Sequence, residues 1–235
     1  MSELMASVPP EEATASAPLL ARVRATFVAP RRLFSTFSDR PPWVDALGLA
    51  TFVAAVAAAA EPAEYYLGQM ENPVDRRGVP VEITSSPQQI VLWGRVMAML
   101  SAIAGHPMLA LAGGGVLLLL FGVLARGGGS FRQYLAVASH ALLILSAGML
   151  VTNVVRLALD APTLLPNVGV LLGLPASGLA GATLQGVNLF TLWMFGVMGA
   201  GAAAIGGRVT TLSATALLWA AYLLLNVIRA LVFGA

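Results

Sequence analysis

The sequence predicts an all-α membrane protein with five transmembrane helices and an N-terminal amphipathic helix that lies at the membrane surface. The chain of 235 residues is 58% hydrophobic and only 10% charged, whereas soluble globular domains carry about 25% charged residues. It also contains several uncharged runs close to the length of about 20 residues that a helix needs to cross a bilayer. A chain of this composition is too apolar to fold as a water-soluble protein.

The uncharged runs give the positions of the expected spans. The first run is short and reaches spanning length only when it is extended back to Trp43 and forward to Tyr65. A further helix is expected to start at Ser86, which has capping-box spacing to Gln89, and to be separated from the second span by Gly105-His106-Pro107. The five spans are expected at about residues 43–62, 107–125, 133–156, 187–207 and 210–231.

The distribution of charge predicts three regions and an orientation. Residues 1–17 are expected to be a disordered cytoplasmic tail, 18–40 an interfacial amphipathic segment, and 41–235 the membrane domain. Arginines are concentrated before the first span and in the links after the second and fourth spans, so the positive-inside rule places the N-terminus in the cytoplasm and the C-terminus outside. All basic residues are Arg, and Ala and Gly are abundant, which indicates a bacterial inner-membrane protein.

The segment before the first span has the pattern of an interfacial arm. Arg31 and Arg32 are expected to hold it at the inner surface, while Phe34 and Phe37 reach the boundary of the acyl chains. Trp43, after a double proline, is a typical interfacial anchor.

The fourth expected span contains small residues at helical spacing. Its stretch "GAGAAA" formally matches a dinucleotide-binding fingerprint, but the chain has no acidic residue after Asp160 to bind a ribose. Close helix packing is the favoured interpretation. The residues expected to make this contact are Gly196, Gly199, Ala200, Ala203, Ala204 and Gly207.

Polar residues are expected to meet near the outer ends of three spans. The third and fifth spans both end with an Asn-Val-(Val or Ile)-Arg sequence, in which Asn and Arg share a helix face. These residues either form an outer-leaflet polar cluster that holds a lipid phosphate, or they are snorkelling arginines with asparagines bonded between helices. The set comprises Asn153, Arg156, Asn188, Asn226 and Arg229.

No pattern in the chain predicts an enzyme. There is no cysteine, which excludes thiolate chemistry, and no catalytic-serine elbow, zinc helix or phosphate-binding loop. We therefore expect no catalytic residue, cofactor, metal or nucleic-acid partner. His140, inside the third span, is either functional or a neutral ring bonded to a neighbouring helix, with Asp45 as the nearest acidic candidate to relay with it. His106 is expected to lie in a turn.

Three motifs in order resemble those of the Yip family (Ypt-interacting proteins), in its bacterial branch. They are "FVAPRRLFSTFSDRPPWVDALGL" before and into the first span, "GGGSFRQYLAVASHALLI" into the third, and "VNLFTLWMFGVMGAGAAAIGG" in the fourth, with Phe190 and Trp193 as its aromatic pair. The resemblance implies five spans with a cytosolic N-terminus, and no catalytic residues. Eukaryotic members act in membrane traffic and bind Rab-type GTPases. The short, basic N-terminal segment departs from that pattern, so no GTPase partner is carried over.

Together these observations predict a non-enzymatic multi-pass membrane protein that organises or assists other membrane components. Its expected partners are the lipid bilayer and either another membrane protein or further copies of the chain. The alternative is a small transporter or channel, or an accessory subunit of a membrane exporter. A polar path through several spans would favour the alternative, but the polar residues gather near one end.

Overall fold

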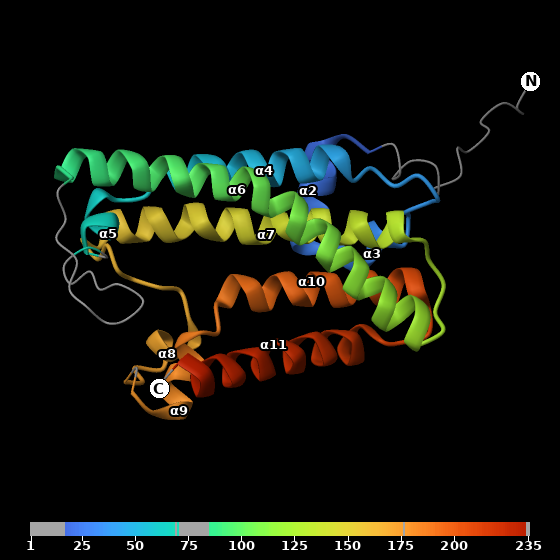
Figure 1. The fold of residues 1–235 in the computed structure, drawn as a ribbon. Helices are drawn as coiled ribbons and strands as arrows, with labels where there is room; N and C mark the ends of the chain where they lie inside the picture. Colours follow the sequence, from blue (N-terminus) through green and yellow to red (C-terminus); the bar gives the residue numbers. More distant parts are fainter. Residues whose placement is uncertain (1–16, 69, 71–84, 176, 234–235) are drawn as a thin grey trace, which may run out of the picture.

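The computed structural model describes residues 17–68, 70, 85–175 and 177–233, and this part of the chain is all-helical without a named strand (Figure 1). Apart from Ala17, the expected disordered tail lies outside the described residues. The helices are α2 (Leu19–Val28), α3 (Pro30–Phe34), α4 (Val44–Ala59), α5 (Ala63–Gly68), α6 (Pro87–Leu117), η1 (Leu118–Leu124), α7 (Phe131–Ala158), α8 (Val168–Leu171), α9 (Gly178–Gln185), α10 (Leu189–Gly206) and α11 (Thr211–Phe233).

Four of these helices are long and apolar enough to cross a membrane: α6 with η1, α7, α10 and α11. They identify the chain as a membrane-embedded protein and correspond to the second to fifth expected spans. The first expected span is α4, whose 16 residues extend about 24 Å at the helical rise of about 1.5 Å per residue. This is shorter than the hydrocarbon core of about 30 Å, so the fifth crossing is not confirmed by length.

Helix α6 differs from the sequence-based expectation. It continues through Gly105, His106 and Pro107 into η1, so the expected break before the second span is wrong. A proline inside a helix removes one backbone hydrogen bond, and transmembrane helices tolerate this loss where neighbouring helices surround them. Close packing on α7 favours the unbroken helix, since a Cβ on Gly114 would lie 3.0 Å from the Leu135 backbone.

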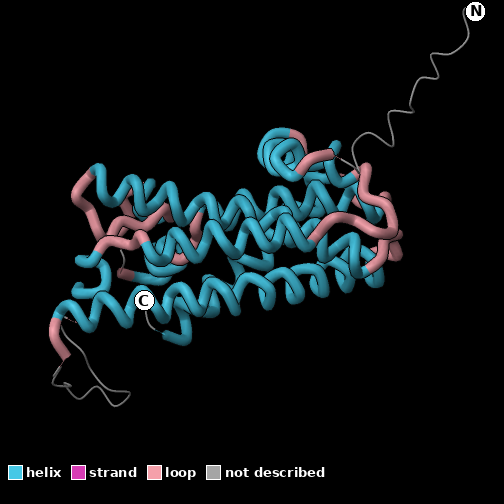
Figure 2. Tube along the Cα trace, turned by 90° about the horizontal axis from the view of Figure 1, so that it is seen from above, coloured by secondary structure: helices cyan, strands magenta, loops and turns pink. Residues whose placement is uncertain are grey.

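Helix α7 is the centre of the fold, in contact with α4, α6 and α10. In Figure 2, most loops gather at the two ends of the resulting bundle. Ser146 donates to the Ala50 carbonyl at 2.8 Å and Asn153 donates to the Ala57 carbonyl at 2.7 Å, and both pairs are 96 residues apart. The constant offset means that α4 and α7 run in the same direction. Alanines of α4 make this contact close, because Ala50 and Ala57 are fully buried.

The N-terminal arm packs on protein. Phe34 and Phe37 are only 1% and 7% exposed, so they do not reach the acyl chains as expected. Arg31 and Arg32 are exposed, and Trp43 is half-buried. A Cβ on Gly201 of α10 would lie 2.9 Å from the Phe34 ring. The missing side chain at that position makes room for the phenylalanine inside the bundle.

The small residues of α10 have different roles. Gly199 lies against α11, where a Cβ would come within 2.7 Å of the Thr215 backbone nitrogen. Ala200 and Ala203 are buried, and Ala204 packs against the core. The other two glycines leave room for a side chain: nothing lies within 4 Å of a Cβ on Gly196 or Gly207. Gly207 instead ends the helix at φ +66°, the left-handed conformation that favours glycine.

Candidate functional site

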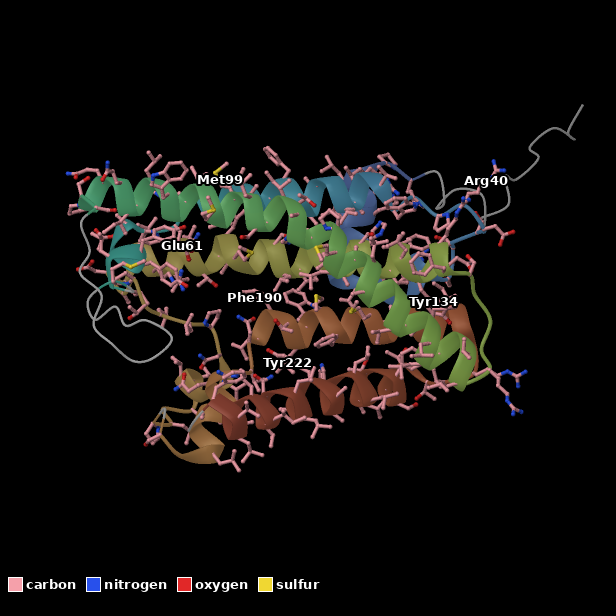
Figure 3. The ribbon with its side chains drawn as sticks, viewed as in Figure 1. Arg40, Glu61, Met99, Tyr134, Phe190 and Tyr222 are labelled. Carbon is pink, nitrogen blue, oxygen red and sulfur yellow. The ribbon has the colours of Figure 1, made fainter. Side chains whose placement is uncertain are left out.

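Glu61, which follows α4, is the centre of a polar cluster that we call the Glu61–Arg156 cluster; it comprises Glu61, Tyr66, Arg95, Asn153 and Arg156. The Glu61 carboxylate accepts hydrogen bonds from Arg156 Nη1 at 2.8 Å and from the Tyr66 hydroxyl at 3.0 Å. Arg95 of α6 donates to the Glu61 carbonyl at 3.0 Å. One acidic residue therefore links α5, α6 and α7 (Figure 3).

Arg156 is only 5% exposed and is held from several sides. Its Nε donates to the Leu164 carbonyl at 2.9 Å, and its Nη1 also lies 3.4 Å from Asn153 Oδ1. The guanidinium carbon lies 4.7 Å from the centre of the Tyr65 ring, a distance at which cation–π attraction contributes. Nη2 donates no hydrogen bond to the described residues.

Tyr66 supports the carboxylate from α5, outside the four candidate spans. Burial first, and then the hydrogen bond and negative charge of Glu61, raise the pKa of Tyr66 above its usual range. The phenol therefore stays protonated and donates to Glu61.

A cavity of about 150 Å³ lies beside this cluster, between α4, α7 and the start of α10. Asn188 enters it from the α10 N-cap, where its Oδ1 accepts from the Phe190 and Thr191 backbone nitrogens at 2.8 and 3.2 Å. Its Nδ2 donates to none of the residues that the structure describes. The cavity is lined by Glu61, Thr152, Asn153, Arg156, Asn188 and mostly apolar neighbours that include Leu145 and Phe190.

Three of the five residues predicted to form one cluster lie together. Asn153, Arg156 and Asn188 line the same cavity. Arg229 donates to the Ala182 carbonyl of α9 at 2.8 Å, and Asn226 donates to the Tyr222 carbonyl of its own helix at 3.0 Å. Both side chains lie against Gly186, two residues before Asn188. One cluster of all five residues therefore stays a prediction, of which three members are shown to share a cavity.

Glu61, Tyr66 and Arg95 were not predicted as site residues. One signal for Glu61 was available in the sequence, because it ends the first apolar run as Arg156 ends the third, and alternate spans end on the same side of a membrane. Tyr66 and Arg95 enter the cluster through the positions of α5 and α6, which no sequence pattern specified.

Both histidines are buried but have different environments. His106 lies inside α6, not in a turn, and its Nε2 lies 3.1 Å from Ser146 Oγ of α7. His140 Nδ1 bonds to the Ala136 carbonyl of its own helix at 2.8 Å, so the expected bond to a neighbouring helix is not formed. Its Nε2 has no hydrogen-bond partner among the described residues. The Phe34 and Phe37 rings lie 6.1 and 5.3 Å from the His140 ring.

An ion pair joins the N-terminal arm to α4 near His140. Arg22 of α2 pairs with Asp45 and is only 4% exposed. The same guanidinium donates to the Pro42 carbonyl at 3.4 Å. Asp45 therefore acts as the counter-ion of Arg22, which ties α2 to the start of α4.

A second, larger cavity of about 400 Å³ lies between α6, α7, α10 and α11. Its walls are almost wholly apolar, and Thr191 and Tyr222 are the only polar side chains among the described residues that line it. The Tyr222 hydroxyl is already engaged. It donates to the Gly186 carbonyl at 3.0 Å and accepts from the backbone nitrogen of Asn188 at 3.1 Å. Leu145 lines both this apolar cavity and the polar one.

No protein-family model, curated protein or solved structure matches the chain. The resemblance to the Yip family therefore stays a prediction from sequence motifs. Among the residues that the structure describes, no group of three or more His, Asp or Glu side chains could hold a metal ion.

Proposed function

We propose that the chain is a non-enzymatic membrane protein that organises or assists other membrane components. The observation that supports this most directly is the contrast between its central and outer helices. The buried share of the most apolar stretch is 72% in α7, but only 22% in α6 with η1 and 17% in α11. Exposed apolar surface of this kind is suited to contact with lipid and with other membrane proteins.

The resemblance to the Yip family agrees with this role but does not define a partner. The buried N-terminal arm leaves Arg31 and Arg32 at the surface, whereas the lipid-facing helices offer much larger surfaces. We therefore assign partner contact to α6 and α11.

The proposed accessory role predicts specific photo-crosslinks in cells. A photoreactive amino acid replacing Leu111 of α6 or Leu224 of α11, which are 52% and 59% exposed, should capture a defined membrane protein or a second copy of the chain. The same probe at Ile144, which is fully buried, should give only adducts within the chain. Adducts would be identified by mass spectrometry and confirmed by reciprocal capture.

Capture of lipid alone from both exposed positions would contradict the accessory role. Ion flux through the purified protein in liposomes would instead favour the transporter or channel interpretation.

We further propose a bacterial inner-membrane protein with five crossings and a cytoplasmic N-terminus. The parallel packing of α4 along α7 supports α4 as the additional crossing, because a helix that lies beside a span in the same direction occupies the same membrane depth.

Single cysteines in the cysteine-free chain test this topology. Probes at Ser38 and Ser130 should react only with reagent on the cytoplasmic side, and probes at Ser85 and Ser177 only with reagent outside. The measurement is labelling of intact cells and inverted vesicles with a membrane-impermeant maleimide. Reaction of positions 38 and 85 from the same side would show that α4 does not cross.

A further inference from the structure

We propose that the polar and apolar cavities together bind one glycerophospholipid. Its phosphate and ester oxygens would lie at Arg156 and Asn188, and one acyl chain would fill the apolar cavity. This inference requires that the chain lies in a bilayer, but it does not depend on the accessory role proposed above.

The polar cavity offers hydrogen-bond donors. Arg156 Nη2 and Asn188 Nδ2 are both free of partners among the described residues, while the remaining polar atoms of these side chains are engaged. The Glu61 oxygens already accept from Arg156 and Tyr66. A ligand that supplies acceptor oxygens therefore fits better than one that supplies donors.

The charges of the Glu61–Arg156 cluster favour an anionic head group. The side chains that form the cluster include two guanidinium groups, those of Arg95 and Arg156, but only one carboxylate, that of Glu61. The Arg95 Nε is also buried without a partner among the described residues. A phosphodiester carries one negative charge and pairs well with guanidinium donors, so it would balance the cluster.

The apolar cavity suits a hydrocarbon chain. Its volume of about 400 Å³ falls within the range of about 300–1,000 Å³ that is typical of ligand sites. It is walled by α6 and α10 side chains such as Val116, Met194 and Met198, with Ala221 on α11. Water gains no hydrogen-bond partners in such a site, whereas an acyl chain gains contacts.

The distance along α7 from Arg156 to Leu145 matches the hydrocarbon thickness of one leaflet. Arg156 and Leu145 lie on α7, 11 residues apart, which is about 16 Å at the helical rise of about 1.5 Å per residue. Half of the hydrocarbon core is about 15 Å. A lipid with its phosphate at Arg156 therefore has its chain at the level of Leu145.

Leu145 lies at the junction of the two cavities and forms a wall that they share, because it lines both of them. Phe190 lies beside this junction, between α7 and α10, in contact with Gly148 (Figure 3). Glycine is needed at 148 because a Cβ there would overlap the Phe190 ring. The upper part of the acyl chain would pass over Leu145 and this ring.

Filling the apolar cavity tests the chain site. Both Ala220 and Ala221 of α11 are exposed, but only Ala221 lines the cavity. Ala221→Phe therefore adds a ring at the cavity wall, whereas Ala220→Phe makes the same change one residue away, outside the cavity. Native mass spectrometry of protein incubated with phosphatidylglycerol in detergent should show one retained lipid per chain. We expect A221F to lower that occupancy by about tenfold, which corresponds to about 1.4 kcal/mol, and A220F to leave it unchanged. Equal occupancy in the two variants would overturn the proposal.

The head-group site is tested separately. Asn188→Asp preserves the N-cap but replaces the free donor with a negative charge, so it should also lower phosphatidylglycerol occupancy. Ser130→Asp, at the N-cap of α7, is the matched control and should retain the lipid. Diacylglycerol, which lacks the phosphate, should bind more weakly than phosphatidylglycerol, and inorganic phosphate alone should not displace the lipid. Displacement by free phosphate, or equal retention of diacylglycerol, would contradict a phospholipid site.

Photolabelling of the unaltered chain tests the same site without requiring that a variant folds. Phosphatidylglycerol with a diazirine on its acyl chain should label Met194 or Met198 after illumination in liposomes. Labels spread only over exposed residues such as Leu111 and Leu224 would indicate annular lipid and overturn the proposal. This result would leave the accessory role untouched, since that role is tested by protein adducts.

Discussion

Replacing Glu61 with leucine should lower the free energy of unfolding by about 3–5 kcal/mol, the usual cost of removing one partner from a buried ion pair. The change would leave the Arg156 guanidinium, only 5% exposed, without its counter-ion. It would also leave the Tyr66 hydroxyl without the carboxylate acceptor at 3.0 Å. The measurement is unfolding of the detergent-solubilised protein with a denaturing detergent, followed by circular dichroism.

The control for this prediction is Glu64→Leu, because Glu64 is exposed on α5, three residues after Glu61. An exposed charge of this kind usually alters stability by no more than about 0.5 kcal/mol. The double variant E61L/R156L removes both charges and should be more stable than E61L alone. If E61L unfolds like the Glu64 variant, the ion pair does not stabilise the fold.

Replacing Gly199 with leucine should force α10 and α11 apart and cost about 1–3 kcal/mol or more through overpacking. A Cβ at this position would lie 2.7 Å and 2.8 Å from the backbone nitrogen and Cα of Thr215. Backbone atoms of a neighbouring helix cannot move aside as a flexible side chain can. The two helices must therefore separate, which also opens the apolar cavity that they help to line.

Gly196→Leu is the matched control, since it makes the same exchange one turn earlier on α10, where a Cβ would meet nothing within 4 Å. Both variants gain the same helix propensity, so their difference in stability reports the contact with α11. The assay is again detergent unfolding, with a cysteine crosslink between α10 and α11 as a measure of their separation. Equal stability of the two variants would rule out close packing at Gly199.

Hydropathy was sufficient to locate the four long apolar helices, because the bilayer imposes both their length and their composition. It could not decide that α6 continues through Pro107. A glycine and a proline two residues apart normally favour a break in a helix. Only the packing of α6 on α7 shows that the helix continues. The same pattern-based reasoning treated Gly196 and Gly199 alike, although only at Gly199 would a Cβ meet α11.

The candidate site was predicted only in part, for a related reason. Arg156 and Asn153 were recognised because polar residues in apolar runs are conspicuous. Glu61, the partner of Arg156, lies 95 residues away, and sequence spacing alone does not show which helices are neighbours. Likewise, the spacing of Phe34 and Phe37 indicated one face of a helix, but could not distinguish a face that meets lipid from one that meets α7.

The hydrogen bonds of α7 have a consequence for biosynthesis. Ser146 and Asn153 bond to α4, Arg156 pairs with Glu61, and His106 of α6 meets Ser146. Every one of these partners precedes α7 in the chain, so each has left the ribosome before α7 does. These contacts of the central helix can therefore form on insertion, without waiting for the two helices that are translated last.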